Sequence, residues 1–417
     1  CMNIILKSAK VINVESKHNG SKQDILISEG KIKKIGSLIT DKNAKIINIK
    51  NLHVSTGWFD SSVSFGEPGY EERETLLNGA DVASKSGFTD LILNSCTKPV
   101  LDNQTDISFI KSKSSNSSCN IHPLGALTIS SKSKDLAELY DMKNSGAVGF
   151  YDFKKPVLNS NLLKTALLYS QSFDSVIMSF PQDNSIAKGG IVNESSISVN
   201  YGIKGIPNFA EEIQVARDLH ILEYTGGKLH IPTISTKKSL ELINKAKSKG
   251  LNVTCSVAMH NLIFNDKKLK DFDTRFKVLP PLREEKDRLA LIKGLKSGLI
   301  DMVTSDHLPI DLENKKTDIE NAKYGTIGLE SLFGSLLSLF DLNQTIEILT
   351  RGRDIFNIKK PTFEIGSKAS LALFTTNEYE FSKTDILSKS KNSAFLGMKM
   401  KGKPIGVING NKISINE

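Results

Sequence analysis

Cysteine is scarce in this chain: there are four in 417 residues, and no two form a CxxC pair. That scarcity excludes a disulfide framework and a zinc site built from thiolates, and it favours a reducing compartment. Long apolar runs are missing too, since no stretch approaches the ~20 residues that a membrane span needs. The first residues, CMNIILKSAKVINV, lack the charged head, long apolar centre and cleavage site of a secretory signal. We therefore expect a cytoplasmic protein that does not associate with a membrane.

Clustered charge of one sign is also absent. Lysine and arginine outnumber aspartate and glutamate by 55 to 46, which gives a net charge of +9. The lysines are scattered along the chain rather than interleaved with aromatic residues, so the pattern argues against nucleic-acid binding. An acidic protein partner would fit this charge.

Short strand patterns occupy both ends of the chain, which is long enough for two domains. Residues 2–54 have the pattern of β strands separated by turns, and the segments 369–376 and 397–415 have the same pattern. The second of these contains the hairpin signal Asn409-Gly410. We expect the ranges 1–54 and 362–417 to form one composite β-sandwich domain.

Between the two ends, strand patterns alternate with helix patterns. The expected strands are 57–65, 89–95, 120–127, 147–152, 175–180, 228–235, 251–258 and 301–307. The expected helices include 135–146, 160–172, 209–227, 236–250 and 284–298. Eight such units predict an α/β fold, a (β/α)₈ TIM barrel over residues 55–361 with its site at the C-terminal ends of the strands.

The first expected barrel strand, within FDSSVSFGEPG at 59–69, carries small polar residues on one face. Asp60, Ser62 and Ser64 hold the even positions, opposite the apolar Phe59, Val63 and Phe65. A barrel enzyme would place metal ligands at such a strand end, so the serines are unexpected.

Several longer motifs carry a family resemblance. They include GWFDSSVSFGEPGYEERETLLNGADVASKSGFTDLIL, LPPLREEKDRLALIKGLKSGLIDMVTSDHLP and LGMKMKGKPIGVINGNKI. Together with shorter matches they resemble dihydroorotases of the amidohydrolase superfamily over essentially the whole chain. The resemblance implies a barrel with a split β domain and a zinc centre that interconverts carbamoyl-aspartate and dihydroorotate. Such a metal polarises the amide carbonyl and lowers the pKa of bound water.

The same resemblance implies that most of the family's ligand positions hold other residues here. The His-x-His pair of the first strand corresponds to Ser62 and Ser64, and a neutral hydroxyl is a poor zinc ligand. The other metal positions correspond to Asp152 (or Lys154, the register being open), Ser179 and Thr233. The family's substrate-binding positions correspond to Gly66, Cys96, Leu279 and Ile310. Asp306 retains the family's acidic residue, and we interpret it as a remnant of the catalytic base.

The seven histidines do not offer a replacement. They stand at positions 18, 53, 122, 220, 230, 260 and 307, and no two have the spacing of a ligand pair. We expect His230 to be a hydrogen-bonded packing residue that faces the helices if Thr233 faces the lumen. Asp306 and His307 are neighbours on a strand, so their side chains should diverge.

We therefore expect a dihydroorotase-like protein that has lost its metal site, needs no cofactor and has little or no activity. Its expected role is that of a structural partner of aspartate carbamoyltransferase in pyrimidine biosynthesis, and a homodimer is expected by family resemblance. One alternative is an active cyclic-amide hydrolase whose residual zinc site is built from Asp152, Lys154 in carboxylated form, and Asp306. Another is a non-catalytic protein that binds a small molecule in the emptied pocket.

Overall fold

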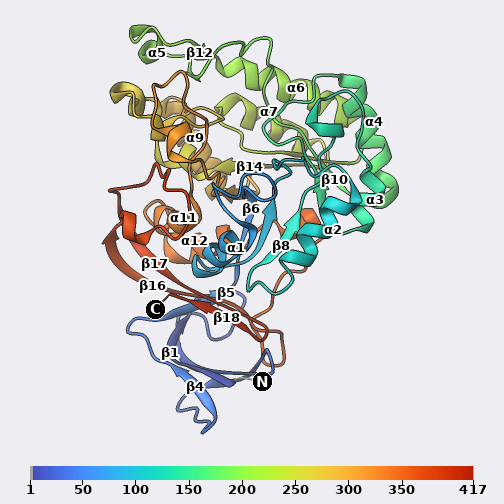
Figure 1. Cartoon of the computed structure of the whole chain (residues 1–417). Helices are drawn as coiled ribbons and strands as arrows, with labels where there is room; N and C mark the ends of the chain where they lie inside the picture. The colour runs from blue at the N-terminus through green and yellow to red at the C-terminus, as the bar shows by residue number, and fades with distance from the viewer. Residues whose placement is uncertain (1–2, 417) are drawn as a thin grey trace.

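A parallel barrel forms the larger part of the computed structural model, which describes residues 3–416 (Figure 1). Each of the eight expected barrel strands is confirmed, although all are shorter than the sequence suggests. They are β6 (Trp58–Val63), β7 (Phe88–Leu93), β8 (Asn120–Pro123), β9 (Gly149–Phe150), β10 (Val176–Met178), β13 (Lys228–Ile231), β14 (Val253–Ala258) and β15 (Met302–Thr304).

Two parallel bridges beyond the regular strands close the barrel. The hydrogen-bonded order is β6-β7-β8 in one sheet and β9-β10-β13-β14-β15 in another. Gly125 bridges to Phe150 and thereby joins the segment after β8 to β9. Val63 bridges to His307, where the Ser64 amide donates to the His307 carbonyl over 2.8 Å. The first strand therefore meets the last one at the rim that carries Ser62 and Ser64.

Helices surround the barrel and follow the expected pattern. They are α1 (Leu76–Lys85), α2 (Gln104–Lys113), α3 (Leu139–Asn144), α4 (Ser160–Ser170), α5 (Ser196–Asn200), α6 (Asn208–Thr225), α7 (Lys237–Ser248), α8 (Met259–Ile263), α9 (Glu285–Lys296), α10 (Leu312–Lys315), α11 (Leu329–Leu337) and α12 (Leu342–Thr350). Side-chain caps fix several starts: Thr75 accepts from the Asn78 amide, and Thr236 accepts from the Ser239 amide. The five helices expected from the sequence all begin and end within four residues of the expected bounds.

Both ends of the chain contribute to one eight-stranded sheet below the barrel (Figure 1). Its strands are β1 (Asn3–Val11), β2 (Lys22–Ser28), β3 (Lys31–Gly36), β4 (Ala44–Ile47), β5 (His53–Thr56), β16 (Ser370–Glu380), β17 (Lys399–Asn409) and β18 (Lys412–Ile415). The order is β18-β17-β16-β5-β1-β2-β3, with β4 paired to β1. The hairpin expected at Asn409-Gly410 is confirmed, because Asn409 pairs with Lys412 and Gly410 adopts a φ of 61°. A core rich in isoleucine and leucine fills this sandwich.

One expectation about β6 is wrong. Phe59 does not share a face with Val63 and Phe65, because register shifts interrupt the pairing of β6 with β7 on both sides of Asp60. Phe59 instead joins the apolar cluster inside the barrel, with its ring 6.1 Å from that of Phe356. Ser62 and Ser64 do share a face, because the Asn94 amide donates to both hydroxyls.

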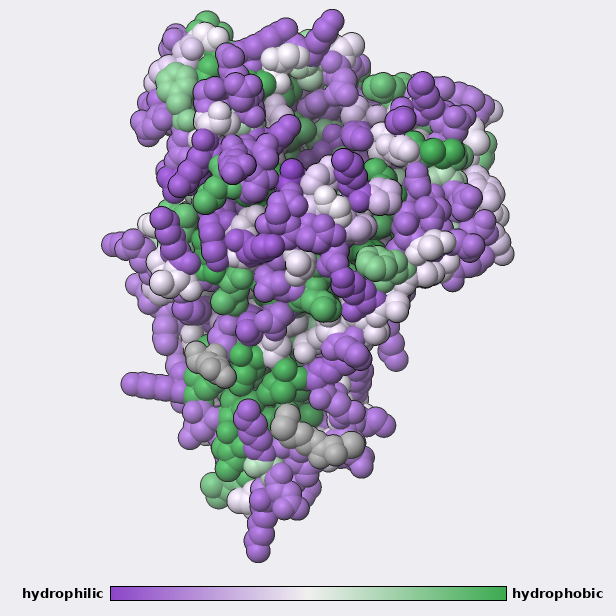
Figure 2. All heavy atoms as spheres, viewed as in Figure 1, coloured by the Kyte–Doolittle hydropathy of each residue, from purple (hydrophilic) through white to green (hydrophobic). Residues whose placement is uncertain are grey.

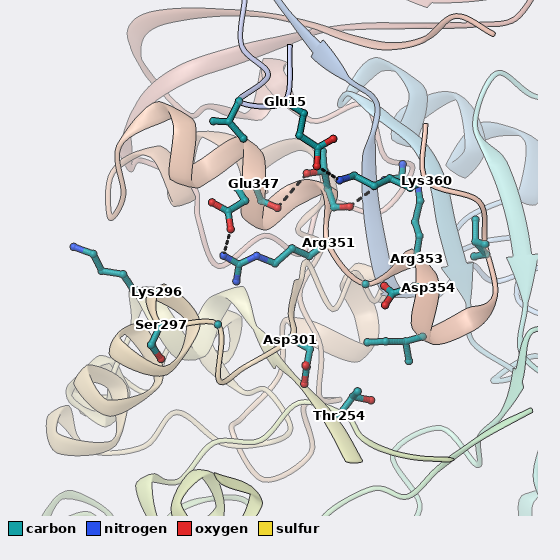
Figure 3. Close-up of a pocket in the computed structure, with 16 residues that line it drawn as sticks. Glu15, Thr254, Lys296, Ser297, Asp301, Glu347, Arg351, Arg353, Asp354 and Lys360 are labelled. Atoms are coloured by element: carbon teal, nitrogen blue, oxygen red, sulfur yellow. Dashed lines mark hydrogen bonds and ion pairs between the residues drawn. The ribbon is translucent and has the colours of Figure 1, made fainter. Parts of the chain in front are cut away.

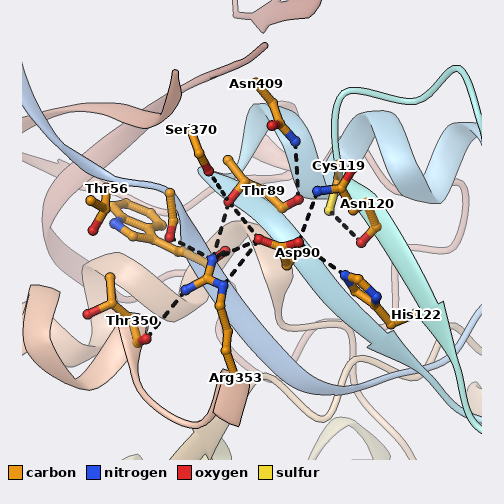
Figure 4. A network of polar contacts seen from close by, with 12 residues as sticks. Thr56, Thr89, Asp90, Cys119, Asn120, His122, Thr350, Arg353, Ser370 and Asn409 are labelled. Carbon is orange, nitrogen blue, oxygen red and sulfur yellow. Dashed lines mark hydrogen bonds and ion pairs between the residues drawn. The ribbon is translucent and has the colours of Figure 1, made fainter. Parts of the chain in front are cut away.

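A buried polar network lies at the opposite end of the barrel, next to the terminal sheet (Figure 4). The guanidinium of Arg353, in the short 3-10 helix Arg353–Phe356, donates to the Asp90 carboxylate over 3.0 Å and to the Gly57 and Trp58 carbonyls. His122 contacts the same carboxylate over 3.0 Å. Burial opposes ionisation of Asp90, but the His122 hydrogen bond and the Arg353 charge outweigh it and hold the pKa of Asp90 well below its usual value.

Hydrophilic side chains dominate the barrel on the face shown in Figure 2, whereas hydrophobic ones gather over the terminal sheet. Within residues 3–416, no helix is both long and apolar enough to cross a membrane.

Candidate functional site

The C-terminal ends of β6 and β7 place Ser62, Ser64 and Asn94 together. The amide nitrogen of Asn94 donates to the Oγ of Ser62 and to the Oγ of Ser64, each over 3.1 Å. All three residues are almost fully buried. The two serines therefore face the same side, as the sequence predicts, and a neighbouring amide satisfies both hydroxyls.

A buried ion pair lies beside these serines. The ammonium of Lys154 lies 2.6 Å from Oδ2 of Asp306, and the two side chains are 9% and 2% exposed. Ser62 Oγ is 3.4 Å from the other carboxylate oxygen. Burial raises the pKa of Asp306, and the charge of Lys154 opposes that shift. The carboxylate that the sequence assigns as a remnant base is thus paired with a lysine of its own chain.

Asp152 does not join this pair. Its carboxylate accepts hydrogen bonds from the backbone amides of Leu127 and Thr128, at 2.9 and 3.0 Å, and from the Thr128 hydroxyl. Of the three residues in the alternative zinc site, Lys154 and Asp306 lie together. The third, Asp152, is hydrogen-bonded to the loop after β8.

Among the described residues, neither Ser179 nor Thr233 hydrogen-bonds to the ion pair. Ser179 donates to Oδ2 of Asp218 on α6 over 2.6 Å. The buried Thr233 hydroxyl has no partner among the described residues, while its backbone amide donates to Ser256 over 3.2 Å. Neither side chain offers a strong metal donor.

The positions that the resemblance assigns to substrate binding are closed or apolar. Cys96 is half-buried, and burial raises the pKa of its thiol, so it lacks the thiolate character of a nucleophile. Leu279 packs into the apolar cluster inside the barrel. Ile310 is buried, and its amide donates to Oδ1 of Asn392 over 3.1 Å.

Gly66, which the resemblance assigns to a substrate-binding position, leaves no space for a side chain. A Cβ at this position would lie 1.8 Å from the carbonyl oxygen of Tyr70. The segment that follows folds back on Gly66, whose amide donates to Glu74 while its carbonyl accepts from Tyr70. The loop backbone therefore occupies the place of a side chain at position 66.

Replacing Gly66 with alanine is expected to lower the free energy of unfolding by about 2 kcal/mol or more, because the loop backbone must move. Urea unfolding would measure this loss. Gly36→Ala is the matched control, since a Cβ there meets no atom within 4 Å. Equal stability of the two variants would contradict the steric explanation.

His230 is a hydrogen-bonded packing residue, as predicted, but it faces the barrel interior rather than the helices. Its ring nitrogens lie 2.8 Å from the Thr254 hydroxyl and 3.1 Å from the Ser256 hydroxyl. Its ring also packs 6.1 Å from Phe356, which belongs to the apolar cluster inside the barrel. Strand alternation does not extend from His230 to Thr233, because the chain turns after β13 and Thr233 adopts a φ of 50° there. Burial lowers the pKa of His230 to about 3, so it is neutral at pH 7.

His307 and His260 are buried without forming a ligand pair. Nδ1 of His307 accepts from the amides of Gly328 and Leu329, at 3.1 and 3.3 Å, so it diverges from Asp306 as predicted. Burial lowers the pKa of His307 to about 3 and that of His260 well below its usual value. Both imidazoles are therefore neutral at pH 7.

These contacts test whether a zinc ion fits the site. Zinc sites in proteins use imidazole, thiolate or carboxylate donors. Ser62, Ser64 and Thr233 provide neutral hydroxyls, and Asp306 is neutralised by Lys154. Across residues 3–416, no three histidine, cysteine, aspartate or glutamate side chains gather as a metal-binding group. The side chains present do not fit the zinc centre implied by the family.

Comparison with known proteins identifies the chain. A dihydroorotase from Pelotomaculum thermopropionicum is 34% identical to it over 100% of this chain and 99% of the relative. This chain belongs to the dihydroorotase family. A dihydroorotase from Aquifex aeolicus is 35% identical over 99% of both chains, and a family model described as Dihydro-orotase-like matches residues 53–239.

Solved structures that share the fold of this dihydroorotase-family chain are cyclic-amide hydrolases. An L-hydantoinase (dihydropyrimidinase) from Arthrobacter aurescens has a TM-score of 0.84 at 22% identity and covers 99% of this chain and 96% of its own. A dihydropyrimidinase from Brevibacillus agri has a TM-score of 0.81 at 19% identity, with 100% and 95% covered. At these identities the likeness establishes the fold, a (β/α)₈ barrel with a β-sandwich built from both termini.

Sequence reasoning missed Asn94, the residue that links the two serines. It named Cys96, two residues later, as the substrate-binding position of this segment. Alternation along an extended segment places residues 94 and 96 on one side, and this signal could have found Asn94. The correspondence between these residues and the family's ligand positions stays a prediction.

Proposed function

We propose that this dihydroorotase-family protein does not catalyse the dihydroorotase reaction and serves as a structural partner of aspartate carbamoyltransferase in pyrimidine biosynthesis. The observation that carries the proposal is the buried Lys154–Asp306 pair beside Ser62 and Ser64. It places an ammonium, rather than a group able to bind a metal, against the retained acidic residue.

The chemistry of the reaction supports this proposal. Hydrolysis of a cyclic amide at a metal centre needs a Lewis acid and a bound water of lowered pKa. The two serine hydroxyls are weak ligands, and Asn94 already donates to both of them. Asp306 could act as a base only after its ion pair with Lys154 had opened.

A second candidate is an active hydrolase with an unusual centre, and the names of the relatives favour it. Both dihydroorotases reported above align with nearly the whole chain at about one third identity. An active centre would need Asp306 to leave Lys154 and two or more further donors to approach it.

Metal content and turnover separate the two candidates. We expect elemental analysis of the purified chain, after incubation with zinc and desalting, to find well below one zinc per chain. We also expect no turnover of dihydroorotate or carbamoyl-aspartate, with a catalytically active dihydroorotase assayed in parallel as the positive control. Stoichiometric zinc together with turnover would overturn the inactive assignment.

The partnership is tested by co-expression with the carbamoyltransferase of the same organism, followed by gel filtration with light scattering. Joint elution is expected, and the mass of the chain alone tests the proposed homodimer. Independent elution of the two proteins would contradict the partnership even if the chain proves inactive.

A further inference from the structure

A cavity of about 710 Å³ lies where the barrel meets the terminal sheet, at the end of the barrel opposite Ser62 and Asp306. Its walls combine barrel residues such as Asn120 and His122 with the linker Asn357–Thr362 and the terminal strands. Figure 4 shows part of this wall, where Asp90, Asn120 and His122 lie side by side. A volume of this size matches that of small-molecule sites.

The charged side chains around this junction cavity are mostly positive. Lys359, Lys360 and Lys368 line it, and the acidic residue among its lining groups is Asp90. Asp90 already contacts Arg353, His122 and Asn120. Lys360 pairs with Glu15, whereas Lys359 and Lys368 form no ion pair with any described residue. The cavity therefore presents two uncompensated ammonium groups.

The surrounding domain strengthens this positive field. Ranges 1–54 and 362–417 contain 18 lysines and 9 acidic residues, so they account for the whole net charge of +9. Residues 55–361 carry 37 basic and 37 acidic residues and are neutral. A concave site with one sign of charge concentrates counter-ions and raises their rate of association.

A neighbouring cavity provides the contrast. It has a volume of about 900 Å³ and is lined by four acidic and four basic side chains (Figure 3). Glu347 pairs with Arg351 over 2.7 Å, and Glu15 pairs with Lys360 over 2.6 Å. Its charges balance, so it offers no preference for an anion.

We propose that the junction cavity is a binding site for a small organic anion with two negative charges, either a phosphate monoester or a dicarboxylate. Lys359 and Lys368 would pair with the acidic groups, and His122, Asn120 and Asn357 would supply polar contacts. Val148, Ile358 and Pro361 would contact the carbon skeleton, which favours an organic anion over an inorganic one. This proposal does not depend on whether the chain is catalytically active.

Calorimetric titration and thermal unfolding of the full chain test the site, with ribose 5-phosphate, succinate and inorganic phosphate as probes. One of the two organic dianions is expected to raise the melting temperature and to bind at least tenfold more tightly than inorganic phosphate. The double variant Lys359→Gln/Lys368→Gln is expected to bind that anion about tenfold or more weakly. The double variant Lys293→Gln/Lys316→Gln removes the same charge from exposed barrel positions and should bind within about twofold of the parent.

Three results would overturn the proposal. They are failure of both organic anions to bind, binding of inorganic phosphate as tight as that of both, and loss of as much affinity in the control variant as in the cavity variant. The last two results would show that net charge alone attracts anions to this chain. Which of the two organic anions binds decides between a phosphate and a carboxylate ligand.

Discussion

Replacing Lys154 with methionine is expected to lower the free energy of unfolding by about 3–5 kcal/mol at pH 8, because it leaves the buried Asp306 carboxylate without its counter-charge. Denaturant unfolding measures the loss. Lys155→Met is the control, since Lys155 is exposed next to it, and we expect a change within about 0.5 kcal/mol there.

The pH dependence of the Lys154→Met variant follows from the sign of the shift. Burial raises the pKa of Asp306 in the folded state, and removing Lys154 raises it further. A carboxyl whose pKa is higher in the folded than in the unfolded state makes stability fall as pH rises between the two values. The defect of the variant should therefore be largest at pH 8 and shrink toward pH 5.

A second substitution separates loss of charge from loss of packing. Lys154→Met/Asp306→Asn removes both charges and should regain most of the stability, because a neutral amide needs no counter-ion. If the double variant is as unstable as Lys154→Met at every pH, the ion pair is not the cause of the loss.

Replacing Arg353 with methionine is expected to cost about 3–5 kcal/mol as well, at the other end of the barrel. Arg353 is 1% exposed and joins the Asp90 carboxylate to the Gly57 and Trp58 carbonyls at the start of β6. Its loss would leave two buried carbonyls and a carboxylate short of a donor. Arg351→Met is the control, because Arg351 forms a surface pair with Glu347 that is worth about 1 kcal/mol or less.

The acid limb of the unfolding curve provides an independent check. The folded-state pKa of Asp90 is lowered, so its contribution to stability is present above the unfolded value of about 3.9 and is lost as pH falls below it. The Arg353→Met variant should show a smaller acid-dependent loss than the parent between about pH 4 and pH 2. An identical acid limb in both proteins would contradict the role assigned to this pair.

The sequence by itself determined the architecture. Alternating strand and helix patterns with regular turn signals predicted eight barrel strands. Strand patterns at both ends of the chain predicted that the two termini share one sheet. It also determined that Ser62 and Ser64 share a face, because side chains two apart on an extended segment point the same way.

The tertiary structure alone decided what those faces contact. The irregular pairing of β6 placed Phe59 inside the barrel, and the turn after β13 left His230 inside as well. Neither reversal can be found by counting residues, because each depends on how a strand pairs with its neighbour or where it ends.

The same holds for the candidate site and for the junction cavity. Lys154 and Asp306 are 152 residues apart, and closure of the barrel brings them within 2.6 Å. Lys359 and Lys368 line one cavity with His122 and Asn120, because the C-terminal strands return to pair with the N-terminal strands in one sheet below the barrel. Local patterns specify the elements, whereas contacts between distant residues, which set the charge balance of each site, exist only after the chain has closed on itself.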